Sequence, residues 1–327
     1  MERLKERLMK QYAPLVEGFV KEIGDLNLTG IPAPHIPIMG EDYVSAKYRM
    51  AFIGIETYGW EDMNVFLETA KKNSGDAVFL MENTINDLEH LGWANNYHAT
   101  FWGFVFKFLA KFYKVGFDDL VQKKAYPELL RSFVWGNTNS IERYHVTAES
   151  NAVNRETWEK VKRASICFDS INNIVKSVNP KLLFVLNYSV NLDYIQSDDA
   201  VRLFGIPVEN KKDIMWLQVD EKRKIEYYYL RNDDVHIILM PHPRWMGQRG
   251  GGIYSYVDNA IELICKYNIW DCLPEGHEDW KGETQVIDKS SMSFKRAFLA
   301  DLAASLMKNN LVMSGQELQK LFNMNSV

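Results

Sequence analysis

The segment from Tyr48 to Gly59, YRMAFIGIETYG, joins an apolar run to a short polar turn. Met50 to Ile53 are all apolar, which is typical of a strand that is covered on both faces in a parallel sheet. Gly54 permits a tight turn, and Glu56 to Gly59 follow it. Open α/β sheets bind their ligands at the carboxyl ends of such strands. The segment therefore predicts a buried strand of an α/β fold with a site directly after it.

A second segment, Val235 to Met246 (VHIILMPHPRWM), repeats this pattern, and His242 follows its apolar strand. A carboxylate, Glu56, and this imidazole at two strand ends form the strongest site hypothesis in the sequence. A third, short strand is expected from Ser132 to Trp135, and Asn137 lies just past it. An asparagine there is either a turn former or the donor and acceptor pair that reads an amide edge, and both interpretations stay open.

Helical periodicity explains much of the remaining chain. It predicts amphipathic helices over residues 3–23 and 76–91, and the clearest helix over 155–178. An Asn-Pro pair ends that helix, and an apolar strand over 181–189 follows. Helix, tight break and strand form the second half of a βαβ unit, which favours a parallel sheet. The next segment, 190–224, is expected to be a polar excursion.

The segment 100–114, TFWGFVFKFLAKFYK, predicts a helix with apolar residues almost all round its axis. Such a helix is typical of a buried core element. The alternative is that Phe101 or Trp102, near its start, forms a face on which a base stacks. The proline-rich segment 31–43 predicts an extended loop, in which His35 is expected to be solvated.

The composition indicates a soluble globular protein and restricts its partners. Of the 327 residues, 46% are hydrophobic and 25% charged. The net charge of -5 means that any nucleic-acid binding would need a local basic patch. No apolar run approaches the roughly 18 residues of a membrane span, and charges interrupt the N-terminal segment, so we expect neither a membrane segment nor a signal peptide. The oligomeric state stays open.

The three cysteines, Cys167, Cys265 and Cys272, are scattered along the chain. They are too few for a disulfide framework, form no CxxC pair and cannot supply four thiolates to an iron–sulfur cluster. We therefore expect reduced thiols, a cytoplasmic location, no metal and no cofactor.

Two domains are expected. An α/β domain would span residues 1–272, with the N-terminal helix, 1–25, packed on it. Residues 273–327 would form a polar linker and a small helical C-terminal appendage.

The order of these segments resembles the uracil-DNA glycosylase superfamily, roughly from Tyr48 to Ile269. Gly54 to Tyr58 (GIETY) is similar to the GxDPY or GxNPG turn of that superfamily, and Val134 to Asn137 (VWGN) to its strand that ends in Asn. His242 to Arg244 (HPR) is similar to its HPS motif, and the helix, Asn-Pro-Lys and strand before it match as well. The resemblance implies a three-layer α/β/α sandwich with a short, mainly parallel central sheet, here with helical N- and C-terminal additions.

The resemblance also implies hydrolysis of an N-glycosidic bond. This reaction needs a carboxylate that stabilises the oxocarbenium character of the sugar and orients water. It also needs a donor to the oxygen of the departing base, where negative charge develops. Glu56 would fill the first role, and a neutral His242 the second.

The same resemblance implies the contacts to the substrate. Asn137 would read the edge of the base, and Tyr58 would pack against its ring and exclude bulkier bases. A flipped base also needs a stacking partner, which would be Phe101 or Trp102.

The motifs also depart from the family pattern. Glu56 stands where the family has Asp or Asn, and Thr57 replaces the proline of the turn. Arg244 replaces the serine that contacts a phosphate; an arginine can bind phosphate with a different reach. Met246 lies where a wedge residue would enter the duplex. These changes put the uracil substrate in question more than the fold.

Two functions follow as hypotheses. The first is a DNA repair enzyme, a hydrolase of the DNA N-glycosylase type that acts on a modified or deaminated base in DNA or on a related nucleoside. The second is a non-catalytic module of the same fold that binds nucleic acid, a nucleotide or a protein partner. The retained Glu56, Asn137 and His242 favour the enzyme, whereas the acidic charge and the substituted motifs favour the module. An unrelated α/β hydrolase is disfavoured because no GxSxG elbow is present.

Overall fold

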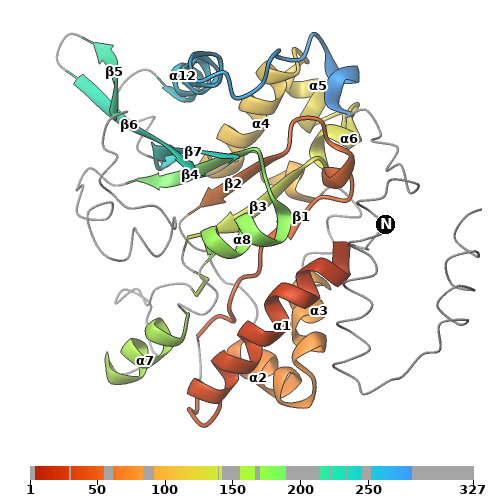
Figure 1. Ribbon diagram of the computed structural model, residues 1–327, viewed down its shortest axis with the longest axis vertical. Helices are drawn as coiled ribbons and strands as arrows, with labels where there is room; N and C mark the ends of the chain where they lie inside the picture. The colour runs from red at the N-terminus through yellow and green to blue at the C-terminus, as the bar shows by residue number, and fades with distance from the viewer. Residues whose placement is uncertain are drawn as a thin grey trace, which may run out of the picture. The chain divides into compact units, whose positions relative to one another are not determined.

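The computed structural model describes residues 4–28, 31–54, 62–83, 92–138, 140–141, 155–165, 170–188, 214–220, 223–232, 234–244 and 252–281 (Figure 1). All of them belong to the first of two compact units, Met1–Gly282. The second unit, Glu283–Val327, lies outside the described residues, as does the helical appendage expected there.

Within the described residues, seven strands form one sheet in the order β1-β3-β2-β4-β7-β6-β5. The four central strands, β3, β2, β4 and β7, are parallel, and β1, β6 and β5 extend the sheet in antiparallel pairing. The prediction of an α/β fold with a parallel centre is therefore confirmed. The strands are β1 (Ile38–Met39), β2 (Met50–Gly54), β3 (Phe133–Asn137), β4 (Leu182–Tyr188), β5 (Ile214–Asp220), β6 (Arg223–Asn232) and β7 (Val235–Pro241).

The described helices include α-helices and short 3₁₀ turns. The α-helices are α1 (Leu4–Ile23), α2 (Met63–Lys72), α3 (Ser74–Asn83), α4 (Thr100–Phe112), α5 (Phe117–Val121), α6 (Pro127–Leu130), α7 (Arg155–Ser165), α8 (Ser170–Val178) and α12 (Gly252–Lys266). The 3₁₀ turns are η1 (Tyr43–Ser45), η3 (Gly92–Asn96) and η6 (His277–Trp280). Among the described residues no helix is long and apolar enough to cross a bilayer.

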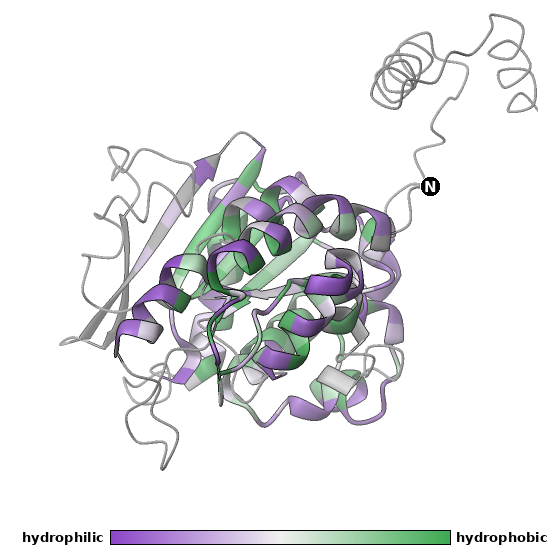
Figure 2. Ribbon diagram, turned by 90° about the horizontal axis from the view of Figure 1, so that it is seen from below, coloured by the Kyte–Doolittle hydropathy of each residue, from purple (hydrophilic) through white to green (hydrophobic). Residues whose placement is uncertain are grey.

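One face of the sheet is covered by α4 and α12 through a largely aromatic core. Phe52 of β2 stacks on Phe184 of β4 with ring centroids 5.3 Å apart. Phe108 of α4 meets Phe184 edge to face at 4.9 Å. The apolar character that surrounds the axis of α4 is explained by this packing, because α4 contacts the sheet through Phe108 and also contacts α5 and α12. Figure 2 shows the strands as mostly hydrophobic ribbon and the helices with hydrophobic and hydrophilic sides.

The opposite face of the sheet packs against α8. Ile171, Ile174 and Val178 of α8 join Ala51 and Ile53 of β2 in a second apolar cluster. Successive side chains of a strand point to opposite faces, so the uninterrupted apolar run of β2 supplies both cores.

A third cluster lies among the helices α1, α2, α3 and α7. Tyr12, Val16 and Phe19 of α1 are its buried centre. Gln11 of α1 donates from Nε2 to Asn173 Oδ1 of α8 at 3.0 Å, so the N-terminal helix also contacts the helical cover of the sheet.

The helix expected over residues 155–178 corresponds to two described helices, α7 and α8, on either side of residues 166–169, which lie outside the description. Val161 and Ala164 of α7 belong to the α1 cluster, whereas Ile171 and Ile174 of α8 belong to the sheet cluster. The two halves of the expected helix thus pack in different clusters, because periodicity identifies a buried side but not its partner.

Two loop expectations also differ from the structure. The polar excursion expected over 190–224 contains β5, which pairs with β6 from Ile214 to Asp220. Leu273 to Lys281, assigned to a linker from the sequence, belong to the first unit: Trp280 joins the aromatic core, and its carbonyl accepts from Lys47 N at 2.7 Å. The described part of the expected linker is therefore attached to the residues that precede β2.

Candidate functional site

The carboxyl ends of the central strands meet at one edge of the sheet. Gly54 at the end of β2 is paired with Asn137 at the end of β3, and Tyr188 of β4 with Pro241 of β7. Figure 1 shows the arrowheads of β2, β3 and β4 on the same side. His242 directly follows β7 and so lies at this edge too. Two strands separate β3 from β7, which puts their backbones about 14 Å apart at the usual strand spacing.

The ends of β2 and β3 are joined by two hydrogen bonds from one residue. Thr138 donates to the carbonyl oxygen of Gly54 from its backbone N at 2.9 Å and from Oγ1 at 3.0 Å. Both bonds lie in the interior, because Thr138 is buried. They hold the strand end that carries Asn137 against the strand end that precedes Glu56.

Gly54 allows two predicted site residues to approach the end of β2. A Cβ atom placed on Gly54 would lie 2.7 Å from Asn137 Oδ1 and 3.4 Å from Phe101 Cε2. The first distance is shorter than any ordinary contact of a Cβ atom, so the Asn137 amide can lie here only because residue 54 is glycine. Asn137 is 3% exposed, and both its amide oxygen and the Phe101 ring lie next to Gly54 at this edge.

The structure separates the two candidate stacking residues. Trp102 is 7% exposed, stacks on Phe106 with ring centroids 5.5 Å apart and meets Trp135 at 5.0 Å. It is therefore a core residue. Phe101 is half-buried in the first turn of α4, next to Gly54 and Asn137, and its ring meets Trp102 edge to face at 5.1 Å. Of the pair, Phe101 is the one placed at the site.

His242 is held in one orientation by the turn that follows β7. The backbone N of Arg244 donates to His242 Nδ1 at 3.2 Å. Burial, and then the charge of Arg244, lower the pKa of His242 below its ordinary value, so the ring is neutral at pH 7. A neutral imidazole whose Nδ1 accepts a hydrogen bond carries its proton on Nε2. Nε2 is thus the hydrogen-bond donor of His242, while the Arg244 side chain is exposed beside it.

Glu56, Tyr58 and Met246 lie outside the described residues, so their expected roles stay predictions. In the described ranges no group of three or more His, Cys, Asp or Glu side chains is placed to hold a metal ion.

His35 is a buried residue next to the site, and the expectation that it is solvated was wrong. It is 1% exposed, its backbone N donates to Ser140 O at 2.6 Å, and its ring lies 4.8 Å from that of Trp135. Burial lowers the pKa of His35 to about 3. The apolar Ile31, Ala33 and Ile36 around it are buried as well. Their apolar character is the signal in the sequence that could have indicated a buried His35. No pattern in the sequence distinguished Thr138.

No model of a known protein family matches this chain, and a comparison with curated proteins found no match either. The resemblance to the uracil-DNA glycosylase superfamily therefore stays a prediction from the sequence motifs.

Proposed function

We propose that this protein is a divergent member of the uracil-DNA glycosylase superfamily that hydrolyses the N-glycosidic bond of a modified or deaminated base in DNA. The observation that carries the proposal is the position of Asn137 and His242 at one edge of a parallel sheet. The fold that accompanies it is a three-layer α/β/α sandwich. The apolar clusters on the two faces of the sheet support that architecture.

In this proposal His242 assists the departure of the base. Negative charge develops on a base oxygen as the N-glycosidic bond breaks, and a prepositioned donor stabilises it. The Nε2–H of the neutral ring is such a donor, and the Arg244 backbone N holds the ring in place. A neutral donor suits this step because it need not give up its proton to the base.

Asn137 and Phe101 supply recognition in the same proposal. The Asn137 amide carries both an acceptor and donors, which complement an amide edge of a base. The Phe101 ring next to it provides an apolar face for a flipped base. Glu56, two residues after Gly54, supplies the carboxylate that orients water and stabilises the sugar cation.

A cleavage assay tests this function. Oligonucleotides that carry uracil, hypoxanthine or another deaminated or alkylated base are incubated with the wild type, Glu56→Gln and His242→Gln. We expect abasic product from the wild type and a loss of about 100-fold or more in either variant, as is usual when a general base or a charge-stabilising donor is removed. His277→Gln, a half-buried histidine of η6, is the matched control and should leave the rate unchanged.

Two outcomes would overturn the proposal. One is that the folded wild type releases no base from any of these substrates, which would favour the non-catalytic module. The other is base release that survives both Glu56→Gln and His242→Gln, because the chemistry would then lie elsewhere.

A further inference from the structure

Aromatic and cationic side chains form a continuous surface on the outer side of α4. The ring centroids of Tyr97 and His98 lie 3.9 Å apart, and Tyr97 meets Phe117 at 6.0 Å. Lys107 Nζ lies 5.6 Å from the centre of the Phe117 ring and 5.0 Å from that of Tyr254. Tyr254 is 58% exposed, and His98 is exposed as well. We refer to these five residues as the α4–α12 surface.

The α4–α12 surface begins beside the candidate site. Tyr97 and His98 precede α4, whose first turn carries Phe101. A Cβ atom on Gly103 would lie 3.1 Å from Tyr97 O and 3.9 Å from Ile253 Cδ1, so the first turns of α4 and α12 are in contact here. Lys107 is six residues beyond Phe101 along α4, a rise of about 9 Å. The surface thus extends from the carboxyl edge of the sheet along the helix.

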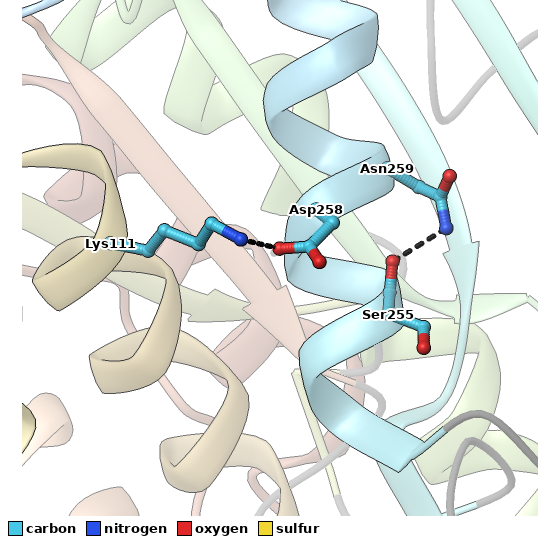
Figure 3. Close-up of polar contacts among 4 residues, drawn as sticks. All are labelled: Lys111, Ser255, Asp258 and Asn259. Carbon is cyan, nitrogen blue, oxygen red and sulfur yellow. Dashed lines mark hydrogen bonds and ion pairs between the residues drawn. The ribbon is translucent and has the colours of Figure 1, made fainter.

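Two neighbouring carboxylates are paired with other lysines, and a third, Asp118 next to Phe117, accepts a hydrogen bond from Gln122 Nε2 at 3.1 Å. Asp258 of α12 forms an ion pair with Lys111 of α4, next to the Asn259 to Ser255 hydrogen bond within α12 (Figure 3). Asp119 of α5 pairs with Lys123 at 2.7 Å. These lysines offset two of the three carboxylates, and the ammonium group of Lys107 lies between the rings of Phe117 and Tyr254. In a chain with a net charge of -5, this is a local environment that an anion can approach.

An exposed ring, Tyr254, and a half-buried ring, Phe117, with an ammonium group between them match the chemistry of single-stranded nucleic acid. Unpaired bases stack on aromatic side chains, while the phosphates between them are attracted to lysine. Duplex DNA keeps its base faces stacked inside the helix and cannot use the rings in this way. We infer that the α4–α12 surface binds single-stranded DNA next to the base that enters the candidate site. This inference rests on the proposed function, because it names the strand state of the same substrate.

Binding of fluorescein-labelled oligothymidine, measured by anisotropy at several salt concentrations, tests the inference. Tyr254→Ala should weaken binding about 5-fold or more, because loss of one stacking partner costs roughly 1–3 kcal/mol. Lys107→Gln should reduce the salt dependence, with a slope of log K against log salt that is smaller by about 0.7 for one lost phosphate contact. Val65→Ala, exposed on α2, and Lys176→Gln, exposed on α8 over the opposite face of the sheet, are matched controls and should bind like the wild type. Circular dichroism melting checks that each variant is folded.

Equal affinity of Tyr254→Ala and wild type, or tighter binding of a duplex of the same sequence, would overturn the inference. The outcome is separable from that of the cleavage assay. If bases are excised but Tyr254→Ala and Lys107→Gln bind normally, the proposed glycosylase function is supported and DNA binding by the α4–α12 surface is rejected. If no base is excised but Tyr254→Ala loses affinity, DNA binding by the α4–α12 surface is supported and the proposed enzymatic function is rejected.

Discussion

At the scale of single residues, the site depends on backbone groups that orient side chains. The N–H of Arg244 selects the tautomer of His242, and the missing side chain of Gly54 makes room for the Asn137 amide. Neither effect requires a charged neighbour. Substitutions that leave the polar residues in place should therefore still impair the site.

Gly54→Ala should impair the site without removing any of its functional groups. The new Cβ atom would lie 2.7 Å from Asn137 Oδ1, so the amide must move. We expect a loss of base release of about 10-fold or more, since a misplacement of about 1 Å can cost as much as 100-fold. The assay is the cleavage rate on the substrate found for the wild type.

Gly18→Ala is the control for this change. Gly18 lies inside α1, and a Cβ atom there meets nothing within 4 Å. Alanine in a helix interior is favoured over glycine by up to about 1 kcal/mol, so this variant should be as stable as the wild type or more so, with full activity. Normal activity of Gly54→Ala would show that the position of the Asn137 amide does not matter.

At the scale of elements, the strands that carry the site could be predicted from the sequence. The strand β5 and the side of α4 that faces the site could not. The ends of β2, β3 and β7 were expected at one edge because apolar runs such as Met50 to Ile53 indicate parallel strands, and their carboxyl ends lie together. The strand β5 was missed because the polar and charged residues around it dominated the pattern. The choice between Phe101 and Trp102 was also open, because adjacent residues of a helix point about 100° apart and only the packing of α4 decides which one meets the sheet edge.

Thr138→Val should loosen the junction of β2 and β3. The substitution removes the Oγ1 bond to the Gly54 carbonyl but keeps the backbone bond and the size of the side chain. We expect a decrease of about 1 kcal/mol in the free energy of unfolding, measured by urea denaturation.

Thr69→Val on α2 provides the comparison. Its Oγ1 donates to the Val65 carbonyl at 2.9 Å on an exposed part of the helix, where water can replace the bond. A smaller effect is expected there. Equal losses in the two variants would mean that burial of the Thr138 bond adds nothing to its contribution.

At the scale of the whole molecule, buried neutral histidines link stability to pH. His35 lies in the interior beside Trp135, and His236 of β7 is hydrogen-bonded through Nδ1 to the hydroxyl of Tyr229 at 2.6 Å. Burial lowers the pKa of His35 to about 3. Burial and then the charges of Lys181 and Arg231 lower the pKa of His236 to about 4. Both side chains therefore stay neutral in the folded protein at pH values where they become protonated in the unfolded chain.

Acidification should begin to destabilise the protein near pH 6.5, which is above the pH range in which carboxylates titrate. Between the unfolded value of about 6.5 and the folded values, the unfolded state binds more protons, so stability rises with pH in this window and is lost as the pH falls through it. Each histidine adds up to about 1.4 kcal/mol per pH unit to the slope. Urea denaturation at pH 7.5, 6 and 5 measures how the free energy of unfolding changes with pH. His236→Gln should flatten the slope, and an unchanged slope would exclude His236 as a contributor.

The order of the central strands also has a consequence for how the chain folds during its synthesis. β2 emerges early from the ribosome, yet its neighbours β3 and β4 begin only at Phe133 and Leu182, and the residues before β2 are joined to Trp280. Pairings between such distant segments form slowly, because a long loop must close, at a cost in chain entropy, before the strands can make their stabilising contacts. The apolar run from Met50 to Ile53 therefore stays unpaired until β3 and β4 have been synthesised. During this delay its exposed apolar surface makes nascent molecules prone to aggregation.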